Sequence, residues 1–255
     1  MWAPTLESRS DWLEWARRAV PALPPEVDIA PQLDVMPAMT RRRLNQLGRM
    51  AAHVAYAAAL SPAKDDDRSS LPTPMIFASR YGDASRSLAL LADLVQERAI
   101  SPTSFSLSVH NAIGAMVSIA RSDRSPQCAI AAGAASAGAA ILEACGLLAD
   151  GAPEVIVVCF DSPLPGEYGP FSNEPAAPYA WAWRVARPSE SEPRIRLTLT
   201  PDQNAFGTPS ENEQLPFGLA LLQFGLADSD HWQRVADHQQ WRFSRHQCAE
   251  PGGAK

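Results

Sequence analysis

The chain has 255 residues, of which 46% are hydrophobic, so it can bury a core large enough for one sizeable domain. Its formal net charge of −6 at pH 7 disfavours binding to nucleic acid or to anionic lipid. Residues 1–20 mix tryptophans with charged side chains, and the longest weakly polar run, 128–149, consists mostly of Ala and Gly. Neither segment has the dense apolar content of a signal peptide or a membrane span, so we expect a cytoplasmic protein.

The N-terminal third predicts two helices and a loop. Ser10 is the expected N-cap of an amphipathic helix over 11–20, and Thr40 is expected to open a second helix whose apolar residues recur at core-facing spacing. Four arginines crowd the start of this second helix: Arg41, Arg42, Arg43 and Arg49. The polar segment 61–73 is typical of an exposed loop.

From residue 74 onward, short apolar runs alternate with amphipathic ones. Strands are predicted at 75–78, 127–132 and 154–160, and helices at 83–99, 112–121 and 134–149. This alternation is typical of an α/β protein, and the continuous apolar run at 154–160 indicates a strand that is buried on both faces.

The C-terminal part predicts further strands. Residues 179–186 and 194–200 both alternate, which fits a hairpin or a pair of sheet strands, and Trp181 and Trp183 share one face that is assigned to the core rather than to a partner surface. A last helix is expected at 215–226 and a last short strand at 241–243.

The cysteines do not form a recognisable pair or metal site. Cys128, Cys145, Cys159 and Cys248 are widely spaced without a CxxC motif, which favours four buried thiols over two disulfides. The sequence also contains no metal-ligand spacing, Walker A motif or GxGxxG fingerprint. We therefore predict no metal and no nucleotide or flavin cofactor.

Small residues gather between the strand predicted at 127–132 and the helix that follows. They are Gly133, Ala134, Ala135, Ser136, Ala137 and Gly138. A helix that starts in such a segment can approach another backbone closely, and its N-terminus presents unpaired N–H groups and a positive dipole. The segment therefore suits a nucleophile or a bound anion.

At this point the sequence resembles the β-ketoacyl synthases of the thiolase superfamily. The stretch IAAGAASAGAAILEACGLLADG, residues 130–151, aligns without a gap with the family's nucleophile elbow, and FSLSVHNAIGAMVSIA and PMIFASRYGDASRSLALL resemble the segments that precede it. The resemblance covers residues 75–165. It implies a half-thiolase α/β core, with one mixed sheet flanked by helices, inside a single domain over 1–255. That domain comprises N-terminal helices and linker at 1–73, the core at 74–165, and strands with a C-terminal extension at 166–255.

The departure from the family matters more than the match. Where the family has the cysteine that takes the acyl chain from an acyl carrier protein, this chain has Ala134. The late histidines His231, His238 and His246 lack the family's catalytic motifs, and the chain matches one of the two α/β halves of a complete synthase. It resembles in particular the short chain-length-factor-like subunits of aryl polyene and xanthomonadin-type pigment clusters, which implies a heterodimer with a full-length ketosynthase.

By this resemblance, the subunit is a non-catalytic partner that shapes the acyl tunnel of the active synthase in polyketide or fatty-acid-type biosynthesis. The candidate residues for the tunnel wall and the interface are Phe105, Leu107, Val109, His110, Asn111, Met116, Gly133 and Ser136. His110 at a helix start could instead be a hydrogen-bonded structural residue. The arginines at 41–43 and 49 are either a solvated face or a docking patch for the acidic carrier protein.

Two other functions stay open. Residues 134–138 form an Ala-x-Ser-x-Gly variant of the α/β-hydrolase elbow, with Asp161 and a late histidine in the corresponding chain order, so Ser136 could serve an esterase. No HGG oxyanion-loop motif occurs upstream. The other possibility is a free-standing module that binds acyl chains or the acyl carrier protein without a ketosynthase.

Overall fold

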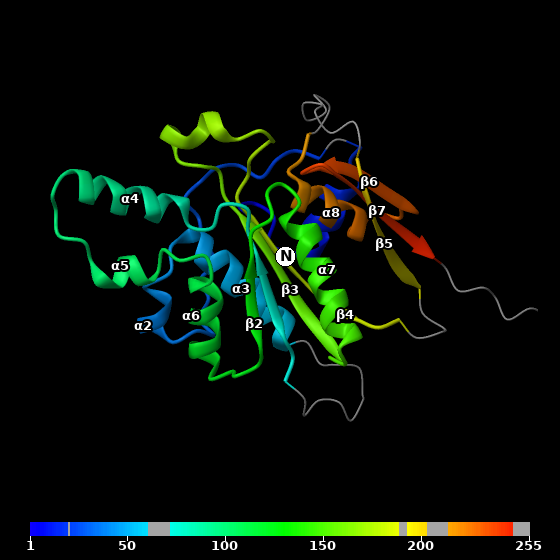
Figure 1. Ribbon diagram of the computed structural model, residues 1–255, viewed down its shortest axis with the longest axis horizontal. Helices are drawn as coiled ribbons and strands as arrows, with labels where there is room; N and C mark the ends of the chain where they lie inside the picture. Colours follow the sequence, from blue (N-terminus) through cyan, green and yellow to red (C-terminus); the bar gives the residue numbers. More distant parts are fainter. Residues whose placement is uncertain (20, 61–71, 189–192, 203–213, 247–255) are drawn as a thin grey trace, which may run out of the picture.

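The computed structural model describes residues 1–19, 21–60, 72–188, 193–202 and 214–246. Its centre is a four-stranded sheet in the order β2-β1-β3-β4 (Figure 1). Strands β1 (Met75–Ala78), β2 (Gln127–Ile130) and β3 (Glu154–Asp161) are parallel, and β4 (Tyr179–Ala186) runs antiparallel to β3. The predicted α/β architecture with a mixed sheet flanked by helices is confirmed.

Helices cover both faces of this sheet, because successive side chains of β3 pack alternately against helices on one face and on the other. Val155, Val157 and Cys159 pack in a core cluster that includes residues of α1 (Arg9–Arg17), α7 (Ser136–Ala149) and α8 (Phe217–Leu226). The intervening side chains of β3 pack in a second cluster with α3 (Gln46–Leu60) and α6 (Ala112–Arg121). The strand is therefore buried on both faces, which explains its uninterrupted apolar sequence.

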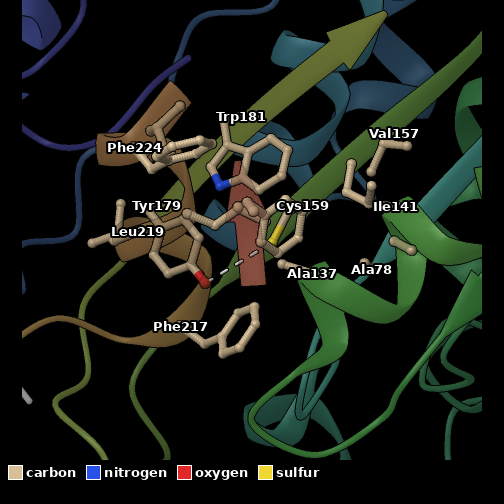
Figure 2. Close-up of a cluster of buried hydrophobic side chains, with 14 of the residues drawn as sticks. Ala78, Ala137, Ile141, Val157, Cys159, Tyr179, Trp181, Phe217, Leu219 and Phe224 are labelled. Atoms are coloured by element: carbon tan, nitrogen blue, oxygen red, sulfur yellow. Dashed lines mark hydrogen bonds between the residues drawn. The ribbon is translucent and has the colours of Figure 1, made fainter. Parts of the chain in front are cut away.

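Aromatic rings fill the first cluster. Figure 2 shows Tyr179 and Trp181 of β4 meeting Phe217 and Phe224 of α8, beside Cys159. The indole N–H of Trp181 donates to the carbonyl of Gly218 at 3.0 Å, so the polar atom of this fully buried ring is satisfied. The prediction that Trp181 belongs to the core is therefore confirmed, while Trp183 is half-buried at its margin.

The N-terminal helices differ from the prediction. Ser8, not Ser10, caps α1, because its hydroxyl accepts the amide of Asp11 while the Asp11 carboxylate accepts the amide of Ser8. The helix predicted to open at Thr40 is two helices, the short α2 (Ala38–Arg41) and α3. Asn45 separates them, because its side-chain oxygen accepts the amide of Gly48 and so caps a new helix.

The segment between β1 and β2 carries two further helices, α4 (Ala84–Val95) and α5 (Pro102–Ser106), which project from one end of the molecule (Figure 1). The side chain of Asp83 caps α4 by accepting the amide of Arg86. The helix ends at Val95, before the predicted end, because Glu97 adopts a positive φ. A 3₁₀ helix, η2 (Gly166–Phe171), lies in the loop after β3.

A second sheet was not foreseen. It is antiparallel, in the order β5-β7-β6, with β5 (Arg194–Pro201), β6 (His231–Ala236) and β7 (Gln239–His246). Residues 179–186 and 194–200 are both strands, as predicted, but of the two arrangements considered the hairpin is wrong, since β4 pairs with β3 and β5 pairs with β7. Alternate residues of the second sheet, such as Trp241 and Phe243, are buried in the first cluster with α8. This packing holds the second sheet in place against α8.

The cysteine prediction holds in part. Cys128, Cys145 and Cys159 are free thiols, but Cys159 is buried, Cys128 is half-buried and Cys145 is exposed on α7. Cys248 and most of the predicted loop at 61–73 lie outside the described residues. Within the described ranges, no helix is long and apolar enough to span a bilayer, and no group of His, Cys, Asp or Glu side chains is arranged to hold a metal ion.

Candidate functional site

The small-residue segment forms a tight turn between β2 and α7. Gly133 adopts a φ of +57°, a conformation in which a side chain would be strained, and Ser136 begins the helix. The buried hydroxyl of Ser136 donates to the carbonyl of Gly133 at 2.7 Å and accepts the amide of Ala132 at 3.0 Å. Ser136 therefore holds the turn in shape, which makes it a structural residue of the elbow.

Ala134 lies at the top of this elbow, where the chain changes from strand to helix. It is half-buried and packs against the first core cluster. Its methyl group can neither attack a thioester nor carry a proton. The nearest cysteines in the sequence lie away from the elbow, Cys128 in β2 and Cys145 well along α7, and partial burial raises the pKa of both thiols.

The hydrolase interpretation finds no support in the geometry. The one hydrogen of the Ser136 hydroxyl is donated to Gly133, so it is not available to a general base. Asp161 accepts hydrogen bonds from the Ser79 hydroxyl at 2.8 Å and from the Arg80 amide at 2.9 Å, which ties it to the end of β1. The serine and the aspartate therefore serve separate local structures.

Asp161 belongs to a buried charge network that the sequence did not reveal. Burial raises the pKa of Asp161 to about 7. Close by, Glu174 forms ion pairs with Arg80 at 3.0 Å and with Arg234 at 3.3 Å, and it accepts the first helical amide of α8. Burial raises the pKa of Glu174, and the two arginines oppose that rise. The network joins the ends of β1 and β3 to α8 and to the second sheet.

A carboxylate from the second sheet reaches the elbow itself. Asp237, in the turn between β6 and β7, accepts the amide of Ala135 through Oδ2 at 3.0 Å. A Cβ atom added to Gly133 would lie 2.5 Å from Oδ1 of the same carboxylate. The N-terminus of α7, which favours an anion, therefore already contacts the carboxylate of Asp237, which lies 102 positions after Ala135 in the chain. The sequence-based candidates did not include Asp237, and its approach depends on a sheet that was not foreseen.

The predicted wall and interface residues do not lie together in one environment. Phe105 is 63% exposed and Val109 is 51% exposed, whereas Met116 is buried in the second core cluster of this chain. Leu107 is half-buried against that cluster. Met116 therefore faces inward here, and the residues that present apolar surface are Phe105 and Val109.

His110 and Asn111 lie between α5 and α6, and Asn111 occupies the N-cap position of α6. His110 packs against Gly82, where an added Cβ would lie 2.7 Å from its Nδ1 atom. This contact ties the start of α6 to the loop after β1. It places His110 in a packing role beside the turn at 79–82.

The four arginines do not share one helix face. Arg41 lies at the end of α2, where its guanidinium donates to Asp34 at 2.6 Å and to the carbonyl of Leu33. Arg42 and Arg43 are exposed in the turn that follows, and Arg49 lies half-buried on α3. The prediction that all four lie in the first turns of a single helix is therefore wrong, because Asn45 starts a new helix after the first three arginines, whereas their role in carrier docking stays a prediction.

The model of the β-ketoacyl synthase N-terminal domain matches residues 12–244. A chain in the structure of the ketosynthase ApeO in complex with its chain length factor ApeC, from Xenorhabdus doucetiae, superposes with a TM-score of 0.78 and 26% identity, covering 95% of this chain and 95% of that one.

A chain of the ishigamide ketosynthase/chain length factor superposes with a TM-score of 0.59 and 14% identity, covering 79% of this chain and 65% of that one, and so supports the fold. No curated protein matched the sequence. The strand, elbow and helix of residues 127–149 lie in the matched region, and the family model spans most of the chain. The chain therefore belongs to the β-ketoacyl synthase family, through its N-terminal domain.

Proposed function

We propose that this chain is a non-catalytic, chain-length-factor-like subunit that pairs with an active β-ketoacyl-ACP synthase in polyketide or fatty-acid-type biosynthesis, of the aryl polyene kind. The observation that carries the proposal is Ala134 at the elbow of a ketosynthase-type fold. A methyl group at this position leaves the fold intact and removes the acyl acceptor. Carbon–carbon bond formation would then take place on the partner.

The likeness to the ApeO–ApeC structure supports a subunit of this kind. The superposition covers 95% of each chain, so the matched chain is about as long as this one. The complex contains a ketosynthase together with its chain length factor. The present chain would take the corresponding place beside a synthase that supplies the cysteine and histidines of the reaction.

The uncovered apolar face of α4 and α5 supports a protein partner. α4 contains the run LALLADLV, yet none of its residues is buried, and Leu94 and Val95 are 59% and 83% exposed. Phe105, on the neighbouring helix α5, is also exposed. A leucine-rich amphipathic helix normally buries its apolar face, so a partner that covers α4 and α5 would remove this surface from water.

Among the described residues, the β2 edge of the sheet has no neighbouring strand. At the β4 edge, residue Trp2 forms a bridge with Ala180, through hydrogen bonds of 2.7 and 2.9 Å. At the opposite edge, β2 pairs with β1 on one side only, and its first residue, Gln127, is exposed. An edge strand presents unpaired N–H and C=O groups that can pair with another chain. We propose that β2, α4 and α5 together face the synthase.

The acyl carrier protein would meet the complex rather than this chain alone. Arg42 and Arg43 are exposed and could contact an acidic carrier at the rim of such a complex, while Arg41 is already engaged with Asp34. Interfacial charge complementarity of this kind raises association rates more than it raises affinity. Phe105 and Val109 of this chain would contribute, across the interface, to the wall of the acyl tunnel in the partner synthase.

Co-expression with candidate full-length ketosynthases tests the proposal. We expect a stoichiometric heterodimer by size-exclusion chromatography and native mass spectrometry, with acylation confined to a cysteine of the partner. A chain that stays alone while the candidate synthases form active homodimers would contradict the proposal. Carrier-protein binding by the isolated chain, together with no synthase binding, would instead favour the free-standing module.

A further inference from the structure

The second sheet lies directly against the elbow through two contacts. The carboxylate of Asp237 touches the residues on both sides of Ala134, namely Gly133 and Ala135. One turn further along α7, a Cβ added to Gly138 would lie 2.7 Å from the ring of Trp241, in β7. Both glycines are therefore needed for the sheet to approach, and the approach places a negative charge beside the position of the missing nucleophile.

The Asp237 carboxylate is positioned by a rigid turn. β6 ends at Ala236 and β7 begins at Gln239, and the two residues between them, Asp237 and His238, both adopt positive φ angles of 50° and 63°. Two-residue turns of this conformation match the twist of antiparallel strands and hold their neighbours in register. Trp241, buried in the first cluster, anchors the same hairpin. The carboxylate therefore reaches the elbow as part of a fixed structure, although the side chain itself is exposed to solvent.

We propose that Asp237 is a second, independent block on acylation of this chain, so that restoring a cysteine at position 134 would not restore an acyl acceptor. A negative charge close to a thiol disfavours the thiolate, which is the nucleophilic form. The same carboxylate takes up the amide of Ala135 at the positive end of α7, and so opposes the dipole that would activate a cysteine. Under the proposed function, this arrangement confines the acyl chain to the partner synthase.

The charge of Asp237 can be separated from its capping role. As a cap, Asp237 satisfies one amide at the start of α7, and asparagine can do the same through its side-chain oxygen. The negative charge of the carboxylate, in contrast, is absent from asparagine. Asp237→Asn therefore removes the proposed block while it keeps the cap. His238, in the same turn, is also titratable, and it is left unchanged.

The test is alkylation by iodoacetamide of a restored cysteine in the full chain. We would compare Ala134→Cys with the double variant Ala134→Cys/Asp237→Asn, and follow each thiol by peptide mass spectrometry between pH 6 and 10. Cys145, exposed on the same helix, serves as an internal reference in every sample. Ala134→Cys/Asp230→Asn is the matched control for loss of one negative charge, since Asp230 lies just before β6.

In the single variant, we expect residue 134 to react more slowly than Cys145 at pH 7. In the Asp237→Asn double variant it should react about threefold faster than in the single variant, because a midpoint lowered by one pH unit raises the thiolate fraction about tenfold while the less basic thiolate is about threefold less nucleophilic. The Asp230→Asn control should change nothing. Rapid alkylation in the single variant, with a midpoint below that of Cys145, would overturn the proposal, as would equal rates with and without Asp237.

The melting temperature of each variant accompanies the alkylation rates, so that a misfolded chain is recognised. The measurement does not need a partner synthase. Its outcome is therefore distinguishable from the outcome of the co-expression test, since a chain that forms no heterodimer still reports the reactivity of residue 134.

Discussion

The two ends of the molecule in Figure 1 differ in how completely they are packed. At one end, β4, α8 and the second sheet bury Trp181, Phe217 and Trp241 in one aromatic cluster. At the other end, α4 and α5 contain no buried residue, although α4 is rich in leucine. The first end is closed within the chain, and the second presents apolar surface to whatever lies beside it.

This difference indicates which parts of the fold depend on the chain alone. The closed end carries its own polar partners, including the Trp181 indole on Gly218 and the ion pairs of Glu174. The open end has exposed apolar side chains on α4 and α5, and β2 is the edge strand of the sheet. Substitutions at the closed end should therefore change stability, whereas those at the open end should change association.

Removing an aromatic ring from the closed end should have the largest effect on stability. Trp181 is fully buried, so Trp181→Ala should lower the free energy of unfolding by about 3–5 kcal/mol through lost burial and a cavity. Urea denaturation of the dilute chain measures this loss. Phe105→Ala, at the open end, is the matched control, with an expected change below about 0.5 kcal/mol. Similar losses for both variants would contradict the comparison.

The ion-pair network should rank next. Glu174→Gln leaves Arg80 and Arg234, whose side chains are 12% and 8% exposed, without their carboxylate partner. Breaking a buried pair from one side typically costs about 3–5 kcal/mol, and we expect the lower end because the glutamine amide oxygen can still accept a hydrogen bond. Urea denaturation measures it, and Glu167→Gln, in the exposed 3₁₀ helix, serves as the control.

Asp161 should make the closed end sensitive to pH. Its pKa is raised from 3.8 to about 7 by burial, so between these values the folded chain holds a proton that the unfolded chain has released. The contribution of Asp161 to stability is therefore full below pH 4 and falls by about 1.4 kcal/mol per pH unit as the pH rises toward 7.

Asp161→Asn should remove that decline, because the amide does not titrate, and its oxygen can still accept from Ser79 and Arg80. Melting temperatures of both forms between pH 5 and 8 measure the difference. A wild-type curve that runs parallel to the variant curve would show that Asp161 is already ionised throughout this range.

At the open end, a charge should break association without unfolding the chain. Val95→Glu places a carboxylate on a side chain that is 83% exposed in the chain alone. We expect at least a tenfold weaker affinity for the partner synthase, since burying the charge in an apolar interface is costly, and an unchanged melting temperature. Val235→Glu, on the exposed face of the second sheet, is the control and should bind normally.

Phe105→Ala should have the smallest effect on stability, but it should change the products of the complex. Phe105→Ala is expected to leave folding and pairing nearly unchanged while it lengthens the acyl products of the complex, because it removes a bulky side chain from the proposed tunnel wall. Product chain length by mass spectrometry measures this. An unchanged product distribution in an intact complex would remove Phe105 from the wall.

The sequence predicted the local elements of the sheet better than their partners. The apolar runs at 75–78 and 154–160 and the small residues at 133–138 mark β1, β3 and the elbow, because burial and close packing restrict residue type. The pairing of β5 with β7, and the contact of Asp237 with Ala135, join residues far apart in the chain. No short-range pattern encodes such contacts, so the sequence identified both strands without their partners, and Asp237 was missed.

Hydrogen–deuterium exchange of the chain alone and in complex with its synthase tests the difference between the two ends most directly. The account predicts protection on binding in β2, α4 and α5, at residues 84–106 and 127–130, and no change in the second sheet at 231–246. Protection confined to the second sheet, with α4 and β2 exchanging as they do in the free chain, would contradict the account and place the partner at the closed end.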